Sequence, residues 1–228
     1  MTPTILHVDN HLLVVSKPAC LPVVPDESGD ESLFDQARIW IEREFQKPGR
    51  AFLGVVHRLD RPVSGVVLFA RTSKAASRLG KAFKERAVSK TYWAISQHAP
   101  KHASGELEQW LHKDSSRNIV RAHERELPGS KLAQTRWRVL TSVGKGSARR
   151  VLVELQPITG RSHQLRVAMA SLGAPILGDL KYGADTPLED RSIALHARSL
   201  QFPHPTLGES LTFQADPPPL QAWNPARK

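Results

Sequence analysis

An uninterrupted apolar run, Val66-Val-Leu-Phe-Ala70, constrains the fold of this chain more than any other feature of its sequence. A short apolar run that follows a turn signal is typical of a strand buried on both faces. Other strands must therefore flank it, and further apolar elements must cover it above and below. A turn from Pro62 to Gly65 precedes the run, and Asp60 lies directly before that turn.

Asp60 is the candidate reactive group of this stretch. It would lie on a loop at the end of a rigid strand, where a side chain can face a cleft while its scaffold stays fixed. Arg58 and Arg61 flank it, and nearby guanidinium groups favour the ionised form of a carboxyl. An ionised, partly desolvated carboxylate can act as a nucleophile. The local pattern alone also fits an ordinary loop aspartate in an ion pair.

Length and charge narrow the class of protein. The 228 residues suffice for one large domain or two small ones, and the net charge of +10 predicts a polyanionic partner. Nucleic acid fits better than a membrane, because no apolar segment approaches the roughly 20 residues that span a bilayer. The N-terminus does not resemble a signal peptide, so we expect a cytoplasmic protein. A single cysteine, Cys20, argues against a disulfide framework or a multi-cysteine zinc site.

Periodicity predicts strands mixed with two flanking helices in the N-terminal part of the chain. We expect two short strands within residues 5–16, and a helix that is capped by Ser32 and ends near Pro48. A second helix, capped by Ser73, follows the apolar run. It carries five basic residues that fit either phosphate contact or a solvated helix face: Lys74, Arg78, Lys81, Lys84 and Arg86. Residues 88–96 alternate like a strand, and residues 97–156 read as antiparallel hairpins.

A second informative stretch runs from Val151 to Gly173. It predicts a strand, a tight turn at Thr159-Gly160 and a helix closed by Gly173. Arg161, His163, Gln164 and Arg166 crowd the start of this helix, where exposed backbone N–H groups attract anions. The spacing alone fits a merely basic helix start equally well.

Five collinear motifs together closely resemble the RluA-type family of pseudouridine synthases over about residues 5–213. They are His57-Arg-Leu-Asp60 with Ser64-Gly65, Lys90-Thr-Tyr92, Thr159-Gly-Arg-Ser-His-Gln-Leu-Arg166, Gly178-Asp-Leu-Lys-Tyr-Gly183 and Leu195-His-Ala-Arg-Ser-Leu-Gln-Phe-Pro-His-Pro205. The chain departs from the family pattern at Val63, where threonine is frequent, and at Cys20 and Val24 in the N-terminal loop.

This resemblance implies a chemistry and a set of residues. Asp60 would be the nucleophile that attacks a target uridine, at the ribose C1′ or at C6 of uracil, and the base would be rejoined to the ribose through C5. Tyr92 would stack on the base and help to remove the C5 proton, and Arg161 would pair with Asp60. Arg58 would fill the space left by the flipped nucleotide.

The resemblance also implies contacts to the RNA from His57, Lys90 and Arg166. No cofactor, nucleotide or metal is expected, because the substrate supplies every atom and no redox change occurs. The partner would be ribosomal or transfer RNA, and a monomer is the default expectation.

The implied fold is α+β, with a curved, mixed and mostly antiparallel sheet, flanking helices and a basic central cleft. We expect residues 1–228 to form a single catalytic domain without a separate N-terminal RNA-binding module. The alternative function is a catalytically silent RNA-binding protein or RNA folding aid. A carboxylate-dependent glycosidase or glycosylase fits less well, since the motifs place no second acid beside Asp60.

Overall fold

The computed structural model describes residues 2–226 and has the α+β architecture predicted from the sequence. It divides into two compact units. Unit 1 comprises Met1–Lys90 and Ala197–Pro217, and unit 2 comprises Thr91–His196 and Pro218–Lys228. The chain passes between them inside β5 (Ser89–Ser96) and inside β10 (Leu195–Pro203).

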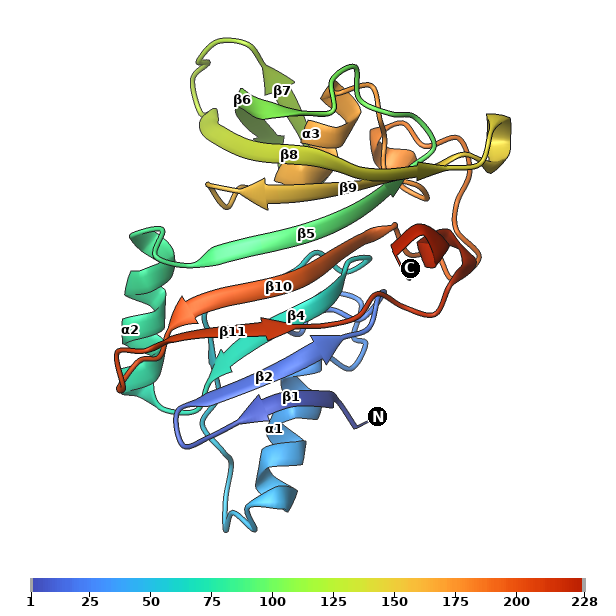
Figure 1. The fold of residues 1–228 in the computed structure, drawn as a ribbon. Helices are drawn as coiled ribbons and strands as arrows, with labels where there is room; N and C mark the ends of the chain where they lie inside the picture. Colours follow the sequence, from blue (N-terminus) through green and yellow to red (C-terminus); the bar gives the residue numbers. More distant parts are fainter. Residues whose placement is uncertain (1, 227–228) are drawn as a thin grey trace. The chain divides into compact units, whose positions relative to one another are not determined.

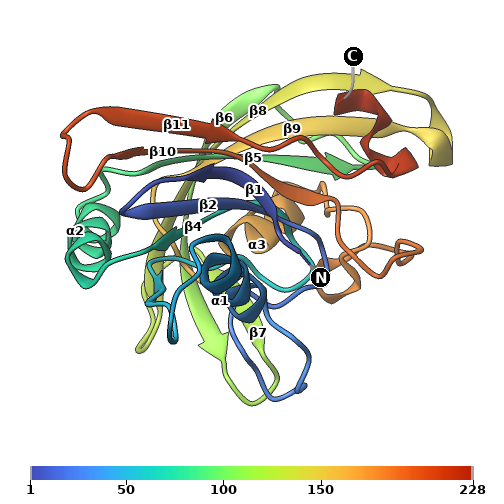
Figure 2. The same ribbon diagram turned by 90° about the horizontal axis from the view of Figure 1, so that it is seen from below.

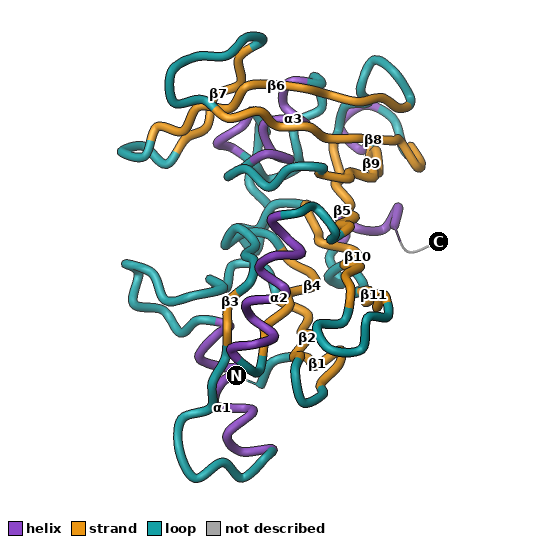
Figure 3. The backbone as a smooth tube through the Cα atoms, turned by 90° about the vertical axis from the view of Figure 1, so that its left-hand side faces the viewer, coloured by secondary structure: helices purple, strands orange, loops and turns teal. Residues whose placement is uncertain are grey.

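Unit 1 is built on strands in the order β1-β2-β4-β10, with β11 paired to β10 and β3 paired to β4. The pairs β1–β2, β2–β4, β3–β4 and β10–β11 are antiparallel. Its strands are β1 (Thr4–Val8), β2 (Leu12–Lys17), β3 (Gly54–Val55), β4 (Ser64–Ala70) and β11 (Ser210–Gln214). Its two helices are α1 (Leu33–Glu44) and α2 (Ser73–Lys84), and Figure 3 shows them as the helical segments of this unit.

Every residue of β4 is buried, which confirms the prediction made from the apolar run. Because successive side chains of a strand point to opposite faces, Leu68 and Phe69 face different neighbours. Phe69 contacts Phe34 of α1, with ring centroids 6.3 Å apart. Figure 2 shows α1 lying against β2 and β4.

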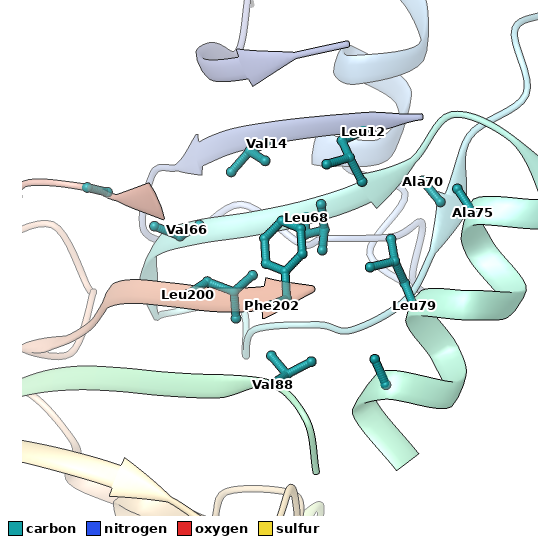
Figure 4. Close-up of a cluster of buried hydrophobic side chains, with 12 residues drawn as sticks. Leu12, Val14, Val66, Leu68, Ala70, Ala75, Leu79, Val88, Leu200 and Phe202 are labelled. Carbon is teal, nitrogen blue, oxygen red and sulfur yellow. The ribbon is translucent and has the colours of Figure 1, made fainter. Parts of the chain in front are cut away.

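The Leu68 face of β4 belongs to a cluster of buried residues that joins β2, β4, α2 and β10. Figure 4 shows Leu79 of α2 and Phe202 of β10 directed toward Leu68. The strand therefore has apolar cover on both sides, which holds its N-terminal end in place. At that end Gly65 has a φ of +118°, and a Cβ there would lie 2.6 Å from the backbone nitrogen of Ala197. Only glycine allows β10 to approach β4 this closely.

Unit 2 is an antiparallel sheet in the order β5-β9-β8-β6-β7. The strands other than β5 are β6 (Ser104–Asp114), β7 (Ile119–His123), β8 (Lys131–Val143) and β9 (Arg150–Pro157). One α-helix, α3 (Gln164–Ser171), follows β9. Short 3-10 turns are η1 (Gly146–Ala148), η2 (Leu180–Tyr182) and η3 (Gln221–Ala226). Figure 1 shows α3 beside β8 and β9.

The core of unit 2 beneath α3 is small. Val167 of α3 packs with Leu111, Val120 and Ala133 from the sheet, and Tyr182 of η2 packs against this cluster. The helix has eight residues and depends on this packing, because an isolated helix of that length is not stable in water. The position of α3 and of the loop before it is therefore set by tertiary contacts.

The predicted elements agree with the structure, apart from some of their ends. Ser32 caps α1 through a hydrogen bond from the Asp35 N–H (3.2 Å), but this helix ends at Glu44, before Pro48. The prediction that Ser73 caps the second helix was wrong by one residue. Thr72 is the cap, and its hydroxyl accepts the Ala75 N–H at 3.1 Å. Serine and threonine are both good caps, so the pair Thr72-Ser73 left the register open.

Candidate active site

Asp60 lies in a tight turn that leads into β4. The Val63 N–H donates to the Asp60 carbonyl oxygen at 3.0 Å, and β4 begins at the next residue, Ser64. The Asp60 residue is partly buried, whereas the neighbouring Arg58 is exposed. A carboxylate thus stands at the entry to the most deeply buried strand of unit 1, as the sequence predicted.

Lys17, at the end of β2, anchors this turn. Its side chain is 1% exposed, and its ammonium group donates to the carbonyl oxygens of Leu21 (2.6 Å), Pro18 (3.0 Å) and Arg61 (3.0 Å). One side chain therefore ties the N-terminal loop to the residue that follows Asp60. This role was not predicted, and the only local signal for it in the sequence is a lysine at the end of an apolar strand.

The charge of Lys17 responds to its surroundings. Burial lowers its pKa to about 7, and the Cys20 and Asp60 charges act in the opposite direction. Asp60 therefore lies near enough to Lys17 to influence its protonation electrostatically. The sequence predicted Arg58, Arg61 and Arg161 as cations near Asp60, but not Lys17.

Arg61 differs from its predicted role. Its guanidinium group forms an ion pair with Asp30 and also donates to the Ser28 hydroxyl (2.9 Å) and the Cys20 carbonyl (3.2 Å). The pKa of Arg61 is raised, chiefly by its hydrogen bond to Asp30. These bonds hold the guanidinium group on the N-terminal loop. Arg61 thus orders the loop around Cys20, and its contacts do not identify it as the partner of Asp60.

His57 faces the protein interior. Its Nε2 accepts the Leu68 N–H at 2.9 Å, and its ring stacks on Phe83 of α2 with centroids 5.0 Å apart. Part of His57 remains accessible, yet its pKa is lowered to about 4, chiefly by burial of the ring and also by the charge of Lys90. The ring is therefore neutral near pH 7 and fastens the segment before Asp60 to β4.

Lys90 lies at the beginning of β5, at the unit 1 end of the strand. Its side chain is partly buried, and burial lowers its pKa. The electrostatic effect on His57 places Lys90 near the segment that carries Asp60. Four of the site residues predicted from the sequence therefore lie in unit 1: His57, Arg58, Asp60 and Lys90.

Unit 2 carries the remaining predicted residues. Tyr92 on β5 is opposite Leu155 of β9 and is partly buried. Arg161 lies in the loop between β9 and α3, where its Nε donates to the Leu132 carbonyl oxygen at 2.9 Å. This single bond fixes one nitrogen of the guanidinium group.

The loop that carries Arg161 is held by Gln164. The Gln164 side-chain oxygen accepts the Arg161 N–H at 3.0 Å and the Thr159 hydroxyl at 2.8 Å, and its amide nitrogen donates to the Gln134 carbonyl at 2.9 Å. Gln164 is buried, so losing any of these bonds would leave a polar group without water. The backbone of Arg161 is thus positioned by a buried network.

Arg166 is buried in an ion pair with Asp179. It is 7% exposed, and its Nε and Nη2 atoms each donate to Asp179 at 2.7 Å. Its guanidinium group also lies over the Tyr182 ring, 5.0 Å from the centroid. Contact with an RNA phosphate would leave the carboxylate of Asp179, which is 1% exposed, without its bidentate partner. The Gly178-to-Gly183 motif therefore supplies a buried counter-ion to the helix that follows Arg161.

Among residues 2–226, no group of three or more His, Cys, Asp or Glu side chains could hold a metal ion.

Comparisons with known proteins place this arrangement in a family. Residues 11–171 match the model of the RNA pseudouridylate synthase family. The chain is 36% identical to the dual-specificity RNA pseudouridine synthase RluA of Escherichia coli (strain K12), over 92% of this chain and 91% of that protein. It is 35% identical to the uncharacterized RNA pseudouridine synthase YhcT of Bacillus subtilis (strain 168), over 92% of this chain and 67% of that protein.

Solved structures with a similar fold also come from RNA pseudouridylate synthase domains. The solved structure of human RNA pseudouridylate synthase domain containing 4 is 29% identical in sequence, with a TM-score of 0.77 over 95% of this chain and 89% of that one. Human RNA pseudouridylate synthase domain containing 1 is 28% identical, with a TM-score of 0.76 over 96% of this chain and 85% of that one.

Proposed function

This chain belongs to the RluA-type family of RNA pseudouridine synthases, and on that premise we propose that it isomerises a specific uridine in structured RNA with Asp60 as the nucleophile. The observation that carries this proposal is the place of Asp60 within His57-Arg-Leu-Asp60, in a hydrogen-bonded turn at the start of β4. The turn fixes the backbone of Asp60, which favours attack of its carboxylate on a correctly placed nucleotide.

The reaction needs one covalent partner and no net addition of atoms. The Asp60 carboxylate attacks the ribose C1′ or C6 of the uracil, and the bond between N1 and C1′ breaks. After the base turns, a bond forms between C5 and C1′, C5 loses its proton, N1 gains one and Asp60 is released. The chemistry is an isomerisation, so it calls for neither a redox cofactor nor a nucleotide.

Family resemblance assigns two further residues to the same nucleotide. Tyr92 would stack on the uracil and assist the loss of the C5 proton, and Arg161 would keep the Asp60 carboxylate charged and oriented. The buried Gln164 network supports this role, because it fixes the backbone of Arg161 and leaves most of its guanidinium nitrogens for other partners.

Arg58 and Lys90 are proposed to contact the RNA from unit 1. Arg58 is exposed beside Asp60, which suits a side chain that enters the space left by a flipped uridine. Lys90 offers a cation near the same segment. His57 is better suited to support than to contact, since its Nε2 is used by Leu68.

The substrate is proposed to be ribosomal or transfer RNA. One relative carries the description "dual-specificity", so an enzyme of this family can act on more than one RNA. Mapping pseudouridine across total RNA from cells with and without the gene would identify the target uridine.

We further propose one catalytic domain that includes both units and works as a monomer in the cytoplasm, with a basic cleft for RNA. Family motifs occur in both units, so neither unit alone contains the full set. Within the described residues, no helix is both long and apolar enough to cross a bilayer.

The Asp60→Asn variant tests the proposal. RNA labelled with tritium at uridine C5 would release the label to water as pseudouridine forms. We expect the variant to release no tritium above background while binding RNA within a few-fold of the wild type. Asp185→Asn is the matched control, because it removes the same charge from an exposed position of unit 2 and should leave turnover unchanged.

Two outcomes would contradict the proposal. Tritium release by Asp60→Asn at the wild-type rate would remove Asp60 from the chemistry. A wild-type protein that binds structured RNA without releasing tritium from any cellular RNA would favour the alternative of a silent RNA-binding protein.

A further inference from the structure

Helix α2 presents a basic face that the isomerisation does not use. Ala75, Leu79 and Ala82 are buried against unit 1. The basic residues of the helix and the residue that follows it are all exposed: Lys74, Arg78, Lys81, Lys84 and Arg86. We call these five residues the α2 stripe. Figure 1 shows α2 at the left-hand side of unit 1, and in Figure 3, viewed from that side, the helix lies in front of the strands of this unit.

The charges in the first turn of α2 are less favourable for helix stability than those of α1. Helix α1 has an acid, Asp35, in its first turn, and Arg38 pairs with Asp35 (3.3 Å) and with Glu42 (3.9 Å). Such placement complements the helix dipole and its neighbouring turns. Helix α2 has no acid in its first turn and instead carries Lys74 there.

Like charges also follow one another along α2. Lys74 and Arg78 are four residues apart, and Lys81 and Lys84 are three apart, so each pair shares one side of the helix. Like-charge neighbours at these spacings destabilise a helix. Lys81 and Lys84 lie in the last turn, where cations complement the helix dipole. Helix stability does not explain Lys74 in the first turn or the spacing of the like charges.

Little counter-charge compensates the α2 stripe. Within the described chain, its single ion pair joins Lys81 to Glu85 at 3.8 Å, and both side chains are more than half exposed. Arg78 donates to the Pro205 carbonyl oxygen at 2.6 Å, which fixes its direction but leaves its charge in place. Lys74 and Lys84 have no ion-pair partner among residues 2–226.

Residues 71–90 carry a net positive charge, whereas the remainder of unit 1 carries a net negative charge. Residues 71–90 contain seven lysine or arginine residues and one acid. The remainder of unit 1 contains eight basic and eleven acidic residues. A mobile polyanion that approaches unit 1 is therefore attracted mainly to α2 and its flanks.

We propose that the α2 stripe is a docking surface for the phosphate backbone of the substrate RNA, separate from the residues that act on the uridine. Its exposed positions carry serine, glycine and charged residues without a large apolar side chain, which argues against insertion into a lipid surface. From Lys74 to Lys84 the helix spans about 15 Å, enough to reach several phosphates. The inference rests on the proposed function and adds a sequence-independent source of affinity.

The test replaces Lys74, Lys81 and Lys84 by glutamine in one variant. Removing three phosphate contacts should reduce the slope of log affinity against log salt by about 2 to 3 and weaken RNA binding about 10- to 100-fold at low salt. KM should rise by a similar factor while kcat, measured by tritium release at saturating RNA, stays unchanged. Arg78 is retained because it also contacts Pro205.

The matched control replaces three exposed lysines of unit 2, Lys101, Lys113 and Lys145, by glutamine. Both variants lose the same charge, so a nonspecific effect of net charge would weaken RNA binding equally in the two. Equal weakening, or an unchanged salt slope in the α2 variant, would overturn the proposal. Neither result would affect the assignment of Asp60, whose test is pseudouridine formation by the wild-type protein.

Discussion

The buried pair between Arg166 and Asp179 allows a sharp test of whether Arg166 contacts RNA or supports the fold. The perturbation is Asp179→Asn, which preserves the shape of the side chain and removes its charge. Arg166 is 7% exposed and Asp179 is 1% exposed, so water cannot replace the lost partner without a structural change. The variant would leave a buried guanidinium group next to a neutral amide.

The expected loss of folding stability is large. Breaking a buried, bidentate ion pair by removing one partner costs about 3–5 kcal/mol. The two bonds of 2.7 Å and the packing of Arg166 over Tyr182 leave little room for relaxation. For a chain of this length, 1 kcal/mol corresponds to about 2–4 °C, so the melting temperature should fall by roughly 6–20 °C.

Urea unfolding followed by tryptophan fluorescence is a suitable assay, because four of the five tryptophans lie in unit 2. Glu106→Gln serves as the control. Glu106 pairs with Arg136 at 2.6 Å in the same unit, but both side chains are more than half exposed, so its loss should cost less than about 1 kcal/mol.

Combining Arg166→Met with Asp179→Asn should restore part of the stability, because no unpaired charge then remains in the interior. The structural role would be refuted if Asp179→Asn unfolded at the same urea concentration as the wild type. It would also be refuted if Arg166→Met kept full stability while its RNA affinity fell. That result is expected if Arg166 contacts RNA, as the family resemblance implies.

Two further predictions concern the proposed active site. Burial lowers the pKa of His57 from its ordinary 6.5 to about 4, so the unfolded chain binds this proton more tightly than the folded protein. This difference makes the free energy of unfolding about 3 kcal/mol higher above pH 6.5 than near pH 4, and the contribution is lost as the pH falls from 6.5 towards 4. His57→Gln, which keeps an acceptor but does not titrate, should therefore show a smaller change in free energy of unfolding between pH 7 and 4; an identical pH profile would contradict this. Arg161→Met should reduce single-turnover tritium release at least about 100-fold yet cost only about 1 kcal/mol of stability, the value of its hydrogen bond to Leu132. A normal rate in that variant would remove Arg161 from the reaction.

Much of this protein follows from local sequence. The run Val66 to Ala70 predicted a fully buried strand, and it is one, because five consecutive apolar residues leave no polar face to turn towards water. The helix after Ser32 and the closure of α3 by Gly173 followed from capping rules that depend on neighbouring backbone groups alone. The family itself was identified from motifs, and the comparisons confirmed it.

The partners of the charged residues were decided by the tertiary structure. Arg61 is next to Asp60 in the sequence, yet its guanidinium group binds Asp30 and Ser28. The buried cation whose pKa is affected by the charge of Asp60 is Lys17, more than forty residues away in the sequence. Arg166 was expected to face RNA and is instead enclosed with Asp179. A long polar side chain can reach many partners at similar intrinsic cost. Which partner it binds depends on the strands and loops that the fold brings beside it, and no local pattern encodes that choice.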